Sequence, residues 1–299
     1  EYEKHGTCCS GLICATKDNG IGVTGLGGNR VKVQFLHIGY NSNSGGGFFT
    51  SDTIVTRAAN KAMQNPKCVA LSMSWGGGNV YSNFVNALNA ARTVARGGKG
   101  LMLFASSGNQ YSSSIAINPA GYDAVMAVGA STQNNMRAPF SNYGSKLFAA
   151  TPGVACPTVD RSGASGYNTT SNYTNFSGTS AACPVMAAIA AAVLVKNPNL
   201  TESQVREILK QAARKTGGYV YDASGKSLEL GYGVIDMHAA VLLAGGDSPI
   251  DPPPPPTATV NMYGVITSPA SALAGTNVPV TYTVNIDKAP AVDTTVLVR

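Results

Sequence analysis

Short apolar runs alternate with segments of helical periodicity through most of the chain. The runs expected to form strands are Val31–Ile38, Val69–Gly76, Leu101–Ala105 and Ala124–Ala130. The segments with helical periodicity are 51–63, 82–96, 181–195 and 201–214. Strands that alternate with helices in this way are typical of parallel sheets built from crossover units. The sequence therefore predicts an α/β fold with a doubly wound, mostly parallel sheet and helices on both of its faces.

Two of these helices carry local start signals. Ser51 or Asp52 is placed to cap the first, and Thr201 to Gln204 has the form of a capping box. The second helix is expected to run to about Arg214 and to stop at Gly217-Gly218, because glycine readily ends a helix.

Ser180 lies in the segment Gly178-Thr179-Ser180-Ala181-Ala182-Cys183-Pro184, at the start of the most apolar helix. A serine at a helix N-terminus has free backbone N–H groups and the positive end of the helix dipole around it, and both favour a developing anion. We therefore interpret Ser180 as a candidate nucleophile. The alternative is an N-cap, which is the commoner role of an isolated serine before a helix.

His5 is the candidate general base. An imidazole titrates near neutral pH, so it can take the serine proton and then deliver it to a leaving amine. The other two histidines, His37 and His238, lie in an expected strand and an expected terminal helix and have no partner motif. A single histidine is otherwise an ordinary surface or core residue.

Asn109 is the candidate side-chain donor to an oxyanion. It belongs to Ser107-Gly108-Asn109, which follows the apolar run Leu101–Ala105 at the point where a strand would end in a loop. An amide N–H at such a site stabilises the negative charge that forms when a nucleophile attacks a carbonyl. Read alone, the tripeptide is a common turn.

Taken together, His5-Gly6-Thr7, Gly108-Asn109 and the segment that begins at Gly178 resemble the subtilisin-like serine proteases, or subtilases. The resemblance extends through residues 1–244 and implies the subtilisin-like form of the α/β fold. It also implies that substrate lies along two segments. The residues expected to bind substrate are Ser74, Trp75, Gly76, Ala105, Ser106, Ser107 and Gly108.

The triad of this family also contains an Asp that orients the histidine, and it precedes the histidine in the chain. Glu1 and Glu3 are the only acids before His5, and they lie too close to it in sequence to face its ring from a neighbouring strand. We therefore expect an N-terminally incomplete catalytic domain whose partner is its own missing Asp-bearing segment. The resemblance places that strand inside the sheet, so its absence would leave an open slot where backbone groups need partners.

The composition limits which other classes of protein this chain can belong to. Charged residues make up only 12% of the chain and there are 34 glycines, which suits a compact, loop-rich extracellular enzyme. The net charge of +6 is spread without a Lys/Arg block, so we expect no nucleic-acid partner. We find no apolar run of about 18 residues and expect no membrane span. The resemblance implies a secreted or cell-surface protein that acts on polypeptides.

Catalysis by this machinery requires no cofactor, and no metal ligands are expected at the catalytic site. The resemblance suggests a structural calcium near Asp18 and Asn19, with a plain Asp-Asn-Gly turn as the alternative. Six cysteines fit either disulfides or buried packing, and packing is favoured for Cys9 and Cys183.

The chain is expected to contain a peptidase domain at 1–245, a proline-rich linker at 246–257 and a partial Ig-like β module at 258–299. The expected function is that of a secreted serine endopeptidase. Because Ser72 to Tyr122 contains no Asp or Glu, we expect it to prefer apolar or neutral P1 residues. The alternatives are a non-catalytic pseudoprotease or structural subunit and, more remotely, an esterase, whose histidine would follow its serine.

Overall fold

A computed structural model describes residues 3–41, 48–77 and 81–246. The chain divides into two compact units, Glu1–Ile250 and Asp251–Arg299. The second unit, which holds most of the predicted linker and the whole predicted β module, lies outside the described residues.

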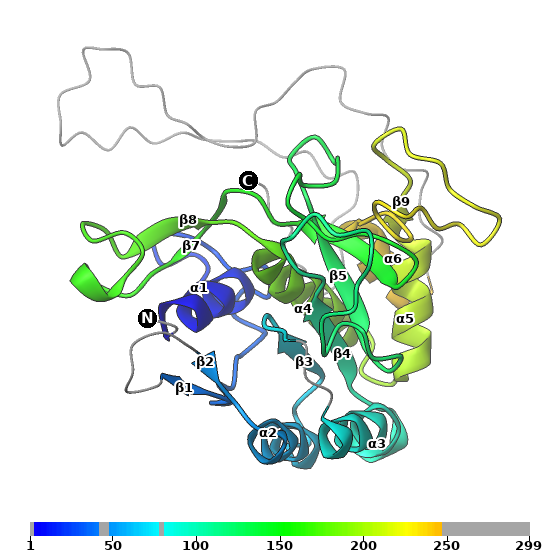
Figure 1. The fold of residues 1–299 in the computed structure, drawn as a ribbon, viewed down its shortest axis with the longest axis horizontal. Helices are drawn as coiled ribbons and strands as arrows, with labels where there is room; N and C mark the ends of the chain where they lie inside the picture. The colour runs from blue at the N-terminus through cyan, green and yellow to red at the C-terminus, as the bar shows by residue number, and fades with distance from the viewer. Residues whose placement is uncertain (1–2, 42–47, 78–80, 247–299) are drawn as a thin grey trace. The chain divides into compact units, whose positions relative to one another are not determined.

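A six-stranded sheet forms the centre of the first unit (Figure 1). Its strands, in spatial order, are β3 (Ala70–Met73), β4 (Met102–Ser106), β5 (Met126–Ser131), β6 (Leu147–Pro152), β10 (Val234–Ile235) and β9 (Ala213–Arg214). The pairs from β3 to β10 are parallel, and only β10 and β9 run antiparallel. The predicted α/β class and the largely parallel sheet are therefore confirmed.

Helices cover both faces of this sheet. On one face lie α2 (Asp52–Gln64) and α3 (Ser82–Gly98), and on the other lie α1 (Glu3–Cys14), α4 (Thr179–Lys196), α5 (Glu202–Gln211) and α6 (Met237–Ala244). Strand β4 shows why both faces are apolar: Met102 and Phe104 pack toward α4, whereas Leu103 packs toward α2 and α3. Side chains that alternate in this way bury a parallel strand on both sides.

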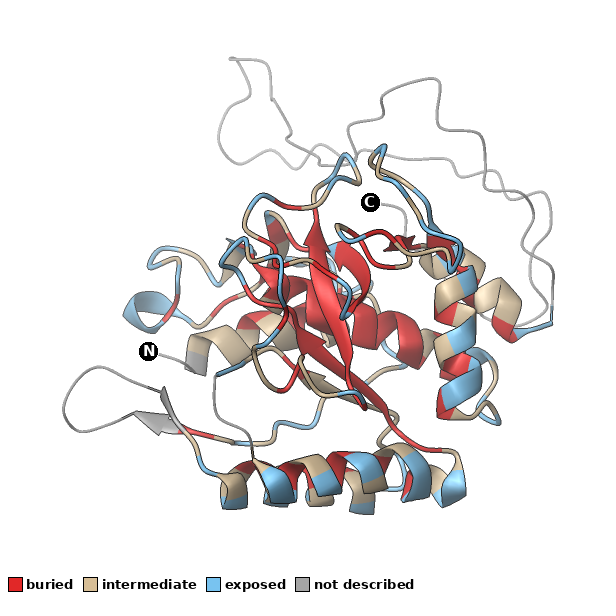
Figure 2. Ribbon diagram, turned by 45° about the vertical axis from the view of Figure 1, so that its right-hand side comes forward, coloured by how far each residue is buried: buried red, intermediate tan, exposed pale blue. Residues whose placement is uncertain are grey.

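Helix α4 is the central core element (Figure 2). It is long and apolar enough to cross a membrane by length and composition, yet 78% of that stretch is buried inside the fold. The stretch is not an unbroken apolar run, and it meets this test because alanines and other small residues raise the mean hydropathy of a helix that packs in a core. Among the described residues, α4 is the one such helix.

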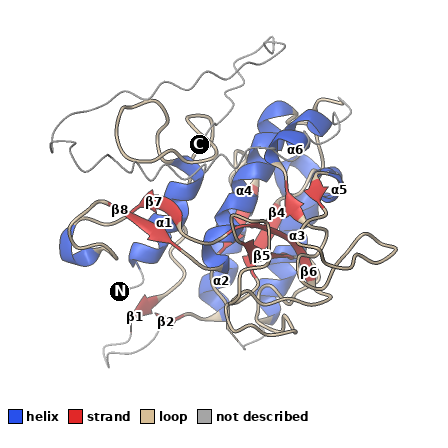
Figure 3. Cartoon of the chain, turned by 90° about the horizontal axis from the view of Figure 1, so that it is seen from above, coloured by secondary structure: helices blue, strands red, loops and turns tan. Residues whose placement is uncertain are grey.

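Helix α1 is held by the hairpin of β7 (Cys156–Val159) and β8 (Tyr173–Phe176), beside which it lies in Figures 1 and 3. The Thr158 hydroxyl donates to the Cys8 carbonyl at 2.7 Å. Gly11 allows this approach, since a Cβ there would collide with Thr158 and Val159. The remaining short elements are β1 (Tyr40–Asn41), β2 (Phe48–Phe49) and a 3₁₀ turn at Gly163–Ser165.

The predicted strand at Val31–Ile38 is wrong. The segment forms no strand, and Lys32, Phe35 and His37 are exposed. Strand β3, which would lie nearest to an extra sheet strand, pairs only with β4 among the described strands. Without a neighbour to supply hydrogen bonds, an apolar run such as 31–38 has no ladder to join.

Two helix boundaries also differ from expectation. Helix α5 begins after Thr201 with the predicted capping box, but it ends at Gln211 because Ala213 and Arg214 pair with β10. Helix α3 contains non-helical backbone at Ala95, Arg96 and Gly97 before it ends. Helix α2 begins as predicted, with the Ser51 side chain accepting from the Ile54 N–H.

Candidate active site

The three predicted catalytic residues come from three different elements. His5 lies in the first turn of α1, Ser180 in the first turn of α4, and Asn109 in the loop after β4. The two helices pack against each other through Cys9, whose Sγ lies 3.8 Å from His5 Nδ1 and 3.4 Å from the Ser180 carbonyl oxygen. The fold thus places the first turns of α1 and α4, which carry His5 and Ser180, close together.

The His5 imidazole has an apolar setting. Its ring meets Phe176 of β8 edge to face at 5.3 Å between centroids. Burial lowers the pKa of His5 from its usual value of 6.5, because the charged form loses solvation. Apart from Cys9, the ring has no hydrogen-bond partner among the described residues, and no carboxylate reaches it there.

The Ser180 hydroxyl is bonded to Ser74, the residue after β3, rather than to His5. It donates to the Ser74 carbonyl oxygen at 3.4 Å, and the Ser74 hydroxyl donates in return to the Ser180 carbonyl oxygen at 2.9 Å. No hydrogen bond joins Ser180 Oγ to the His5 ring in this structure. The nucleophile and the base are therefore neighbours that are not directly coupled.

Asn109 faces the start of α4. Its Oδ1 accepts from the Thr179 backbone N–H and from the Thr179 hydroxyl, each at 2.9 Å. A backbone N–H can only donate, so these bonds fix which side-chain atom is the oxygen. The other atom, Nδ2, is a donor without a partner among the described residues, on an exposed side chain beside Gly178.

A second donor lies close by. The Ser180 backbone N–H makes no hydrogen bond to the described residues, as expected in the first turn of a helix. Gly178, with φ of +134°, precedes this turn, and a Cβ there would lie 3.4 Å from Asn109 Nδ2. Two N–H donors without partners among the described residues consequently lie at the same helix start, where they are free to donate to a ligand.

The predicted substrate-binding residues fall into two groups. Ser74, Trp75 and Gly76 follow β3 and are partly or fully accessible to solvent. Ala105, Ser106, Ser107 and Gly108 are all buried. Because Met73 and Ala105 are register partners in adjacent parallel strands, the two segments leave the sheet side by side at one edge.

Sequence reasoning missed two residues of this site. Thr179 joins the loops, because its hydroxyl accepts from the Gly108 N–H at 3.2 Å while also binding Asn109. Asn142 lies beneath the same loop, with a side chain that bonds to four groups in residues 107–112. The segment around Asn142 can be recognised in the sequence, but the hydrogen-bond partners of the Asn142 side chain lie 30 or more residues away along the chain.

The cysteines form no disulfide, and all six are free. Burial raises the pKa of both the Cys8 and the Cys9 thiol to about 12, and that of Cys183 to about 11. Cys183 lies on α4 with its Sγ 3.4 Å from Ser72 Oγ. These thiols are therefore neutral near pH 7 and pack as small side chains.

The loop at Asp18 and Asn19 forms a turn in which the Asp18 carboxylate is exposed. The Asp18 carboxylate pairs with Lys17 at 2.8 Å, and Asn19 Oδ1 accepts from the Ile21 N–H at 3.1 Å. No group of three or more His, Cys, Asp or Glu side chains suited to a metal occurs in the part of the chain that the structure describes.

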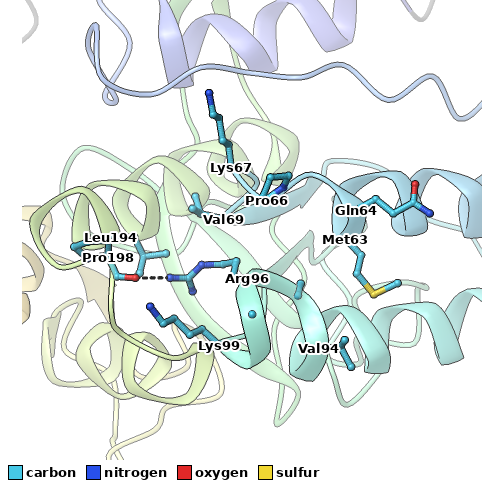
Figure 4. Close-up of a pocket in the computed structure, with 12 residues that line it drawn as sticks. Met63, Gln64, Pro66, Lys67, Val69, Val94, Arg96, Lys99, Leu194 and Pro198 are labelled. Carbon is cyan, nitrogen blue, oxygen red and sulfur yellow. Dashed lines mark hydrogen bonds between the residues drawn. The ribbon is translucent and has the colours of Figure 1, made fainter.

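A hollow of about 490 Å³ lies at the other end of the sheet, beside the start of β3 (Figure 4). Its lining includes Val69 and Leu194 together with the cationic Lys67, Arg96 and Lys99. Arg96 donates to the Pro198 carbonyl oxygen at 3.1 Å, as the dashed line in Figure 4 indicates. This hollow is separate from the three predicted catalytic residues.

The subtilase family of peptidases matches residues 1–233. A calcium-dependent protease of a Nostoc species is 31% identical over 279 residues, covering 81% of this chain and 40% of that protein. Alkaline elastase YaB of a Bacillus species is 34% identical, covering 74% of this chain and 53% of the elastase. Subtilisin DY of Bacillus licheniformis is also 34% identical, covering 79% of this chain and 77% of that protein. The chain belongs to the subtilase family.

Solved protease structures have the same fold as this chain. A protease from Pseudoalteromonas arctica has a TM-score of 0.65 at 26% identity, over 80% of this chain and 70% of that chain. A psychrophilic subtilisin-like protease from an Antarctic Pseudoalteromonas has a TM-score of 0.64 at 20% identity and shares the fold. The chain spans about 40% of the length of the Nostoc protease. It covers most of the length of both solved structures.

Proposed function

We propose that this chain is the catalytic part of a serine endopeptidase in which Ser180 is the nucleophile and His5 the general base. The observation that carries the proposal is the pair of unpaired donors, Asn109 Nδ2 and the Ser180 N–H, at the start of α4. An N-cap role for Ser180 would not require an amide held beside the same turn.

The chemistry follows from these positions. His5 takes the proton of the Ser180 hydroxyl while Oγ attacks the peptide carbonyl, and the oxyanion accepts from the two donors. His5 then gives the proton to the leaving amine, which leaves an acyl-enzyme. Water, deprotonated by His5, hydrolyses that ester and regenerates the serine. Attack requires the Ser180 hydroxyl to turn from the Ser74 carbonyl toward His5.

The carboxylate that orients His5 comes, in this proposal, from a segment outside the 299 residues. Two features support it. The His5 ring meets no carboxylate among the described residues, and among the described strands β3 pairs with β4 alone. A strand added along β3 would supply the ladder that residues 31–38 lack.

The test is hydrolysis of unfolded casein by the full-length protein and by its Ser180→Ala variant. The proposal expects loss of cleavage and of labelling by a fluorophosphonate in Ser180→Ala, while Ser203→Ala, which changes an exposed serine on α5, retains both. Equal cleavage by Ser180→Ala and the unmodified protein would reject Ser180 as the nucleophile.

We further propose a preference for apolar or neutral P1 residues. The support is the absence of Asp and Glu from Ser72 to Tyr122, the stretch that includes both predicted substrate-binding segments. Peptide p-nitroanilides that differ only in P1, with Phe, Leu, Lys or Arg, measure it. A higher kcat/KM for Lys or Arg would contradict the preference.

Calcium binding and a secreted location are two finer proposals. The names of two relatives state calcium dependence, and we propose that the full-length protein binds a structural calcium near Asp18 and Asn19, whose side chains offer oxygen ligands. Addition of EDTA should lower its thermal midpoint; an unchanged midpoint would contradict this. A secreted or cell-surface location predicts the intact protein in the medium or on the surface of producing cells.

A non-catalytic role is the second candidate, and two observations favour it. The Ser180 hydroxyl is bonded to Ser74 and not to His5, and no carboxylate supports the histidine within the described residues. In that case the full-length protein would neither cleave casein nor react with a fluorophosphonate.

A further inference from the structure

Asn142 is a buried amide with a complete set of hydrogen bonds. Its side chain is 3% exposed. Oδ1 accepts from the Gln110 and Ser112 backbone N–H groups, each at 2.9 Å. Nδ2 donates to the Ser107 carbonyl oxygen at 2.9 Å and to Gln110 Oε1 at 3.0 Å. An asparagine side chain has two donors and one acceptor oxygen, so this amide is fully used.

All four bonds go to the loop that contains Asn109. The backbone of Asn142 adds to them, because its N–H donates to the Gly108 carbonyl oxygen at 2.9 Å and its carbonyl accepts from the Ser107 hydroxyl at 3.2 Å. Asn142 therefore binds residues on both sides of Asn109 without touching Asn109 itself.

Gly108 shows how close this contact is. Its φ is +101°, and a Cβ at this position would collide with the Asn142 amide group. The loop can lie against Asn142 only with glycine here, because a side chain would be strained in this backbone conformation and would occupy the place of the amide.

Further contacts hold the two loops together. Tyr111 N–H donates to the Phe140 carbonyl oxygen and Tyr143 N–H to the Ser112 carbonyl oxygen, each at 2.9 Å. The Arg137 guanidinium lies over both tyrosine rings, 4.7 Å from Tyr111 and 4.5 Å from Tyr143. Asn142 lies at the centre of this contact, at the part of the loop nearest to Asn109.

We propose that Asn142 is a positioning residue that fixes the Asn109 amide in place to receive the oxyanion. The proposal rests on the proposed function and adds a residue to it. Asn142 holds Gly108 and Gln110, Gly108 N–H bonds to Thr179, and Thr179 bonds to Asn109 Oδ1, so the unused Nδ2 is aimed by a continuous set of contacts. A donor that is fixed before the reaction stabilises charge better than one that must be ordered during it.

The test compares kcat and KM in the full-length protein. Asn142→Ala is expected to lower kcat by about 10- to 100-fold with little change in KM, because small displacements of catalytic groups cost factors of this size. In an Asn109→Ala background the same change should lower kcat by less than about threefold, because residues that act as a unit are not additive. A multiplicative effect of the two changes would overturn the proposal.

The matched control is Asn197→Ala. Asn197 is also an asparagine whose Nδ2 donates to a backbone carbonyl, that of Ala244 at 3.2 Å, but it caps the far end of α4 from Ser180. It is expected to change stability without changing kcat. If Asn142→Ala does not fold, Asn142→Asp replaces it, since the acid keeps the shape and the oxygen but loses the two donors.

Hydrogen exchange separates this proposal from the proposed function. In Asn142→Ala, the amides of Gln110 and Ser112 should exchange faster while those of β5 remain protected. Unchanged exchange at both amides would overturn the positioning role whether or not the protein hydrolyses peptides. Inactivity of the unmodified protein with a fluorophosphonate would instead reject the proposed function and leave the exchange result to decide how the loop is held.

Discussion

The Cys9 thiol lies 3.8 Å from His5 Nδ1, on the side of the imidazole where a triad carboxylate would bind. Burial raises the pKa of Cys9 to about 12, so the group near Nδ1 is uncharged. A neutral thiol supplies no negative charge to stabilise the imidazolium that forms when the histidine takes a proton. The described residues therefore place His5 near Ser180 but put no negative charge beside its Nδ1.

The protonation of His5 should report this directly. Burial lowers the pKa of His5 from 6.5, so the 299-residue chain should titrate His5 below that value, and a carboxylate supplied by an added segment should raise it. NMR titration of the His5 ring, assigned with His5→Gln, measures both. A pKa above 6.5 in the 299-residue chain would mean that a carboxylate already reaches the ring.

The same shift has a consequence for stability. A histidine whose pKa is lowered by folding binds more protons when unfolded, so stability is full above about pH 6.5 and falls as the pH drops below it. Urea unfolding at pH 5 and pH 7.5 should show this loss, and His5→Gln should show a smaller one. An identical pH dependence in the variant would argue against a lowered pKa.

The buried thiols should resist alkylation. With the pKa of Cys9 raised to about 12 and that of Cys183 to about 11, almost no thiolate is present at pH 7.5. Iodoacetamide followed by peptide mass analysis should modify both slowly in the folded protein and readily in urea. Rapid modification of Cys9 in the folded state would show that the contact between α1 and α4 opens.

Removal of the Asn109 amide should impair the chemical step. Asn109→Ala loses the Nδ2 donor and should lower kcat by roughly 10²- to 10³-fold with KM nearly unchanged, which is the magnitude established for the loss of one such donor in subtilisin, another member of this family. Asn134→Ala, at an exposed turn position away from the site, serves as the control. A change confined to KM would indicate a role in binding substrate instead.

Glu202 should matter for stability and not for catalysis. Its side chain is 4% exposed and pairs with Arg206 at 2.6 Å and Arg92 at 3.2 Å, so it links α5 to α3. Glu202→Gln should destabilise the fold by about 2 kcal/mol, because the buried side chain loses its charge-assisted hydrogen bonds to two partly exposed arginines. Glu207→Gln on the same helix, whose exposed acid pairs with Lys210, should cost less than about 1 kcal/mol. Similar midpoints in urea for the two variants would contradict this difference.

Local signals in the sequence were sufficient for much of the fold. The Thr201 capping box and the Ser51 cap form as expected, because both depend on neighbours within three residues. Residues 31–38 show where such reasoning fails. Their apolar pattern predicts a strand, but a strand requires a partner that the pattern cannot reveal. Helix α5 likewise ends early because Ala213 pairs with a strand more than 20 residues later.

The residues of the candidate site likewise divide into those that local sequence could predict and those that it could not. Ser180, His5 and Asn109 could be proposed from three short motifs, since each motif combines a reactive group with a helix start or a strand end. Asn142 and Thr179 could not be assigned, because their roles depend on bonds to loops 30 to 71 residues away. The Ser74 contact that holds the Ser180 hydroxyl could not be foreseen either, since it depends on the packing of α4 against β3.

The catalytic role of Ser180 is best tested by fluorophosphonate labelling of the full-length protein beside the 299-residue chain, with peptide mapping of the labelled site. We predict rapid labelling of Ser180 in the full-length protein, and slow or no labelling in the 299-residue chain, whose described residues place no carboxylate at His5. Equal labelling of both would contradict the need for an added carboxylate, and labelling of neither would contradict the assignment of Ser180 as an active nucleophile.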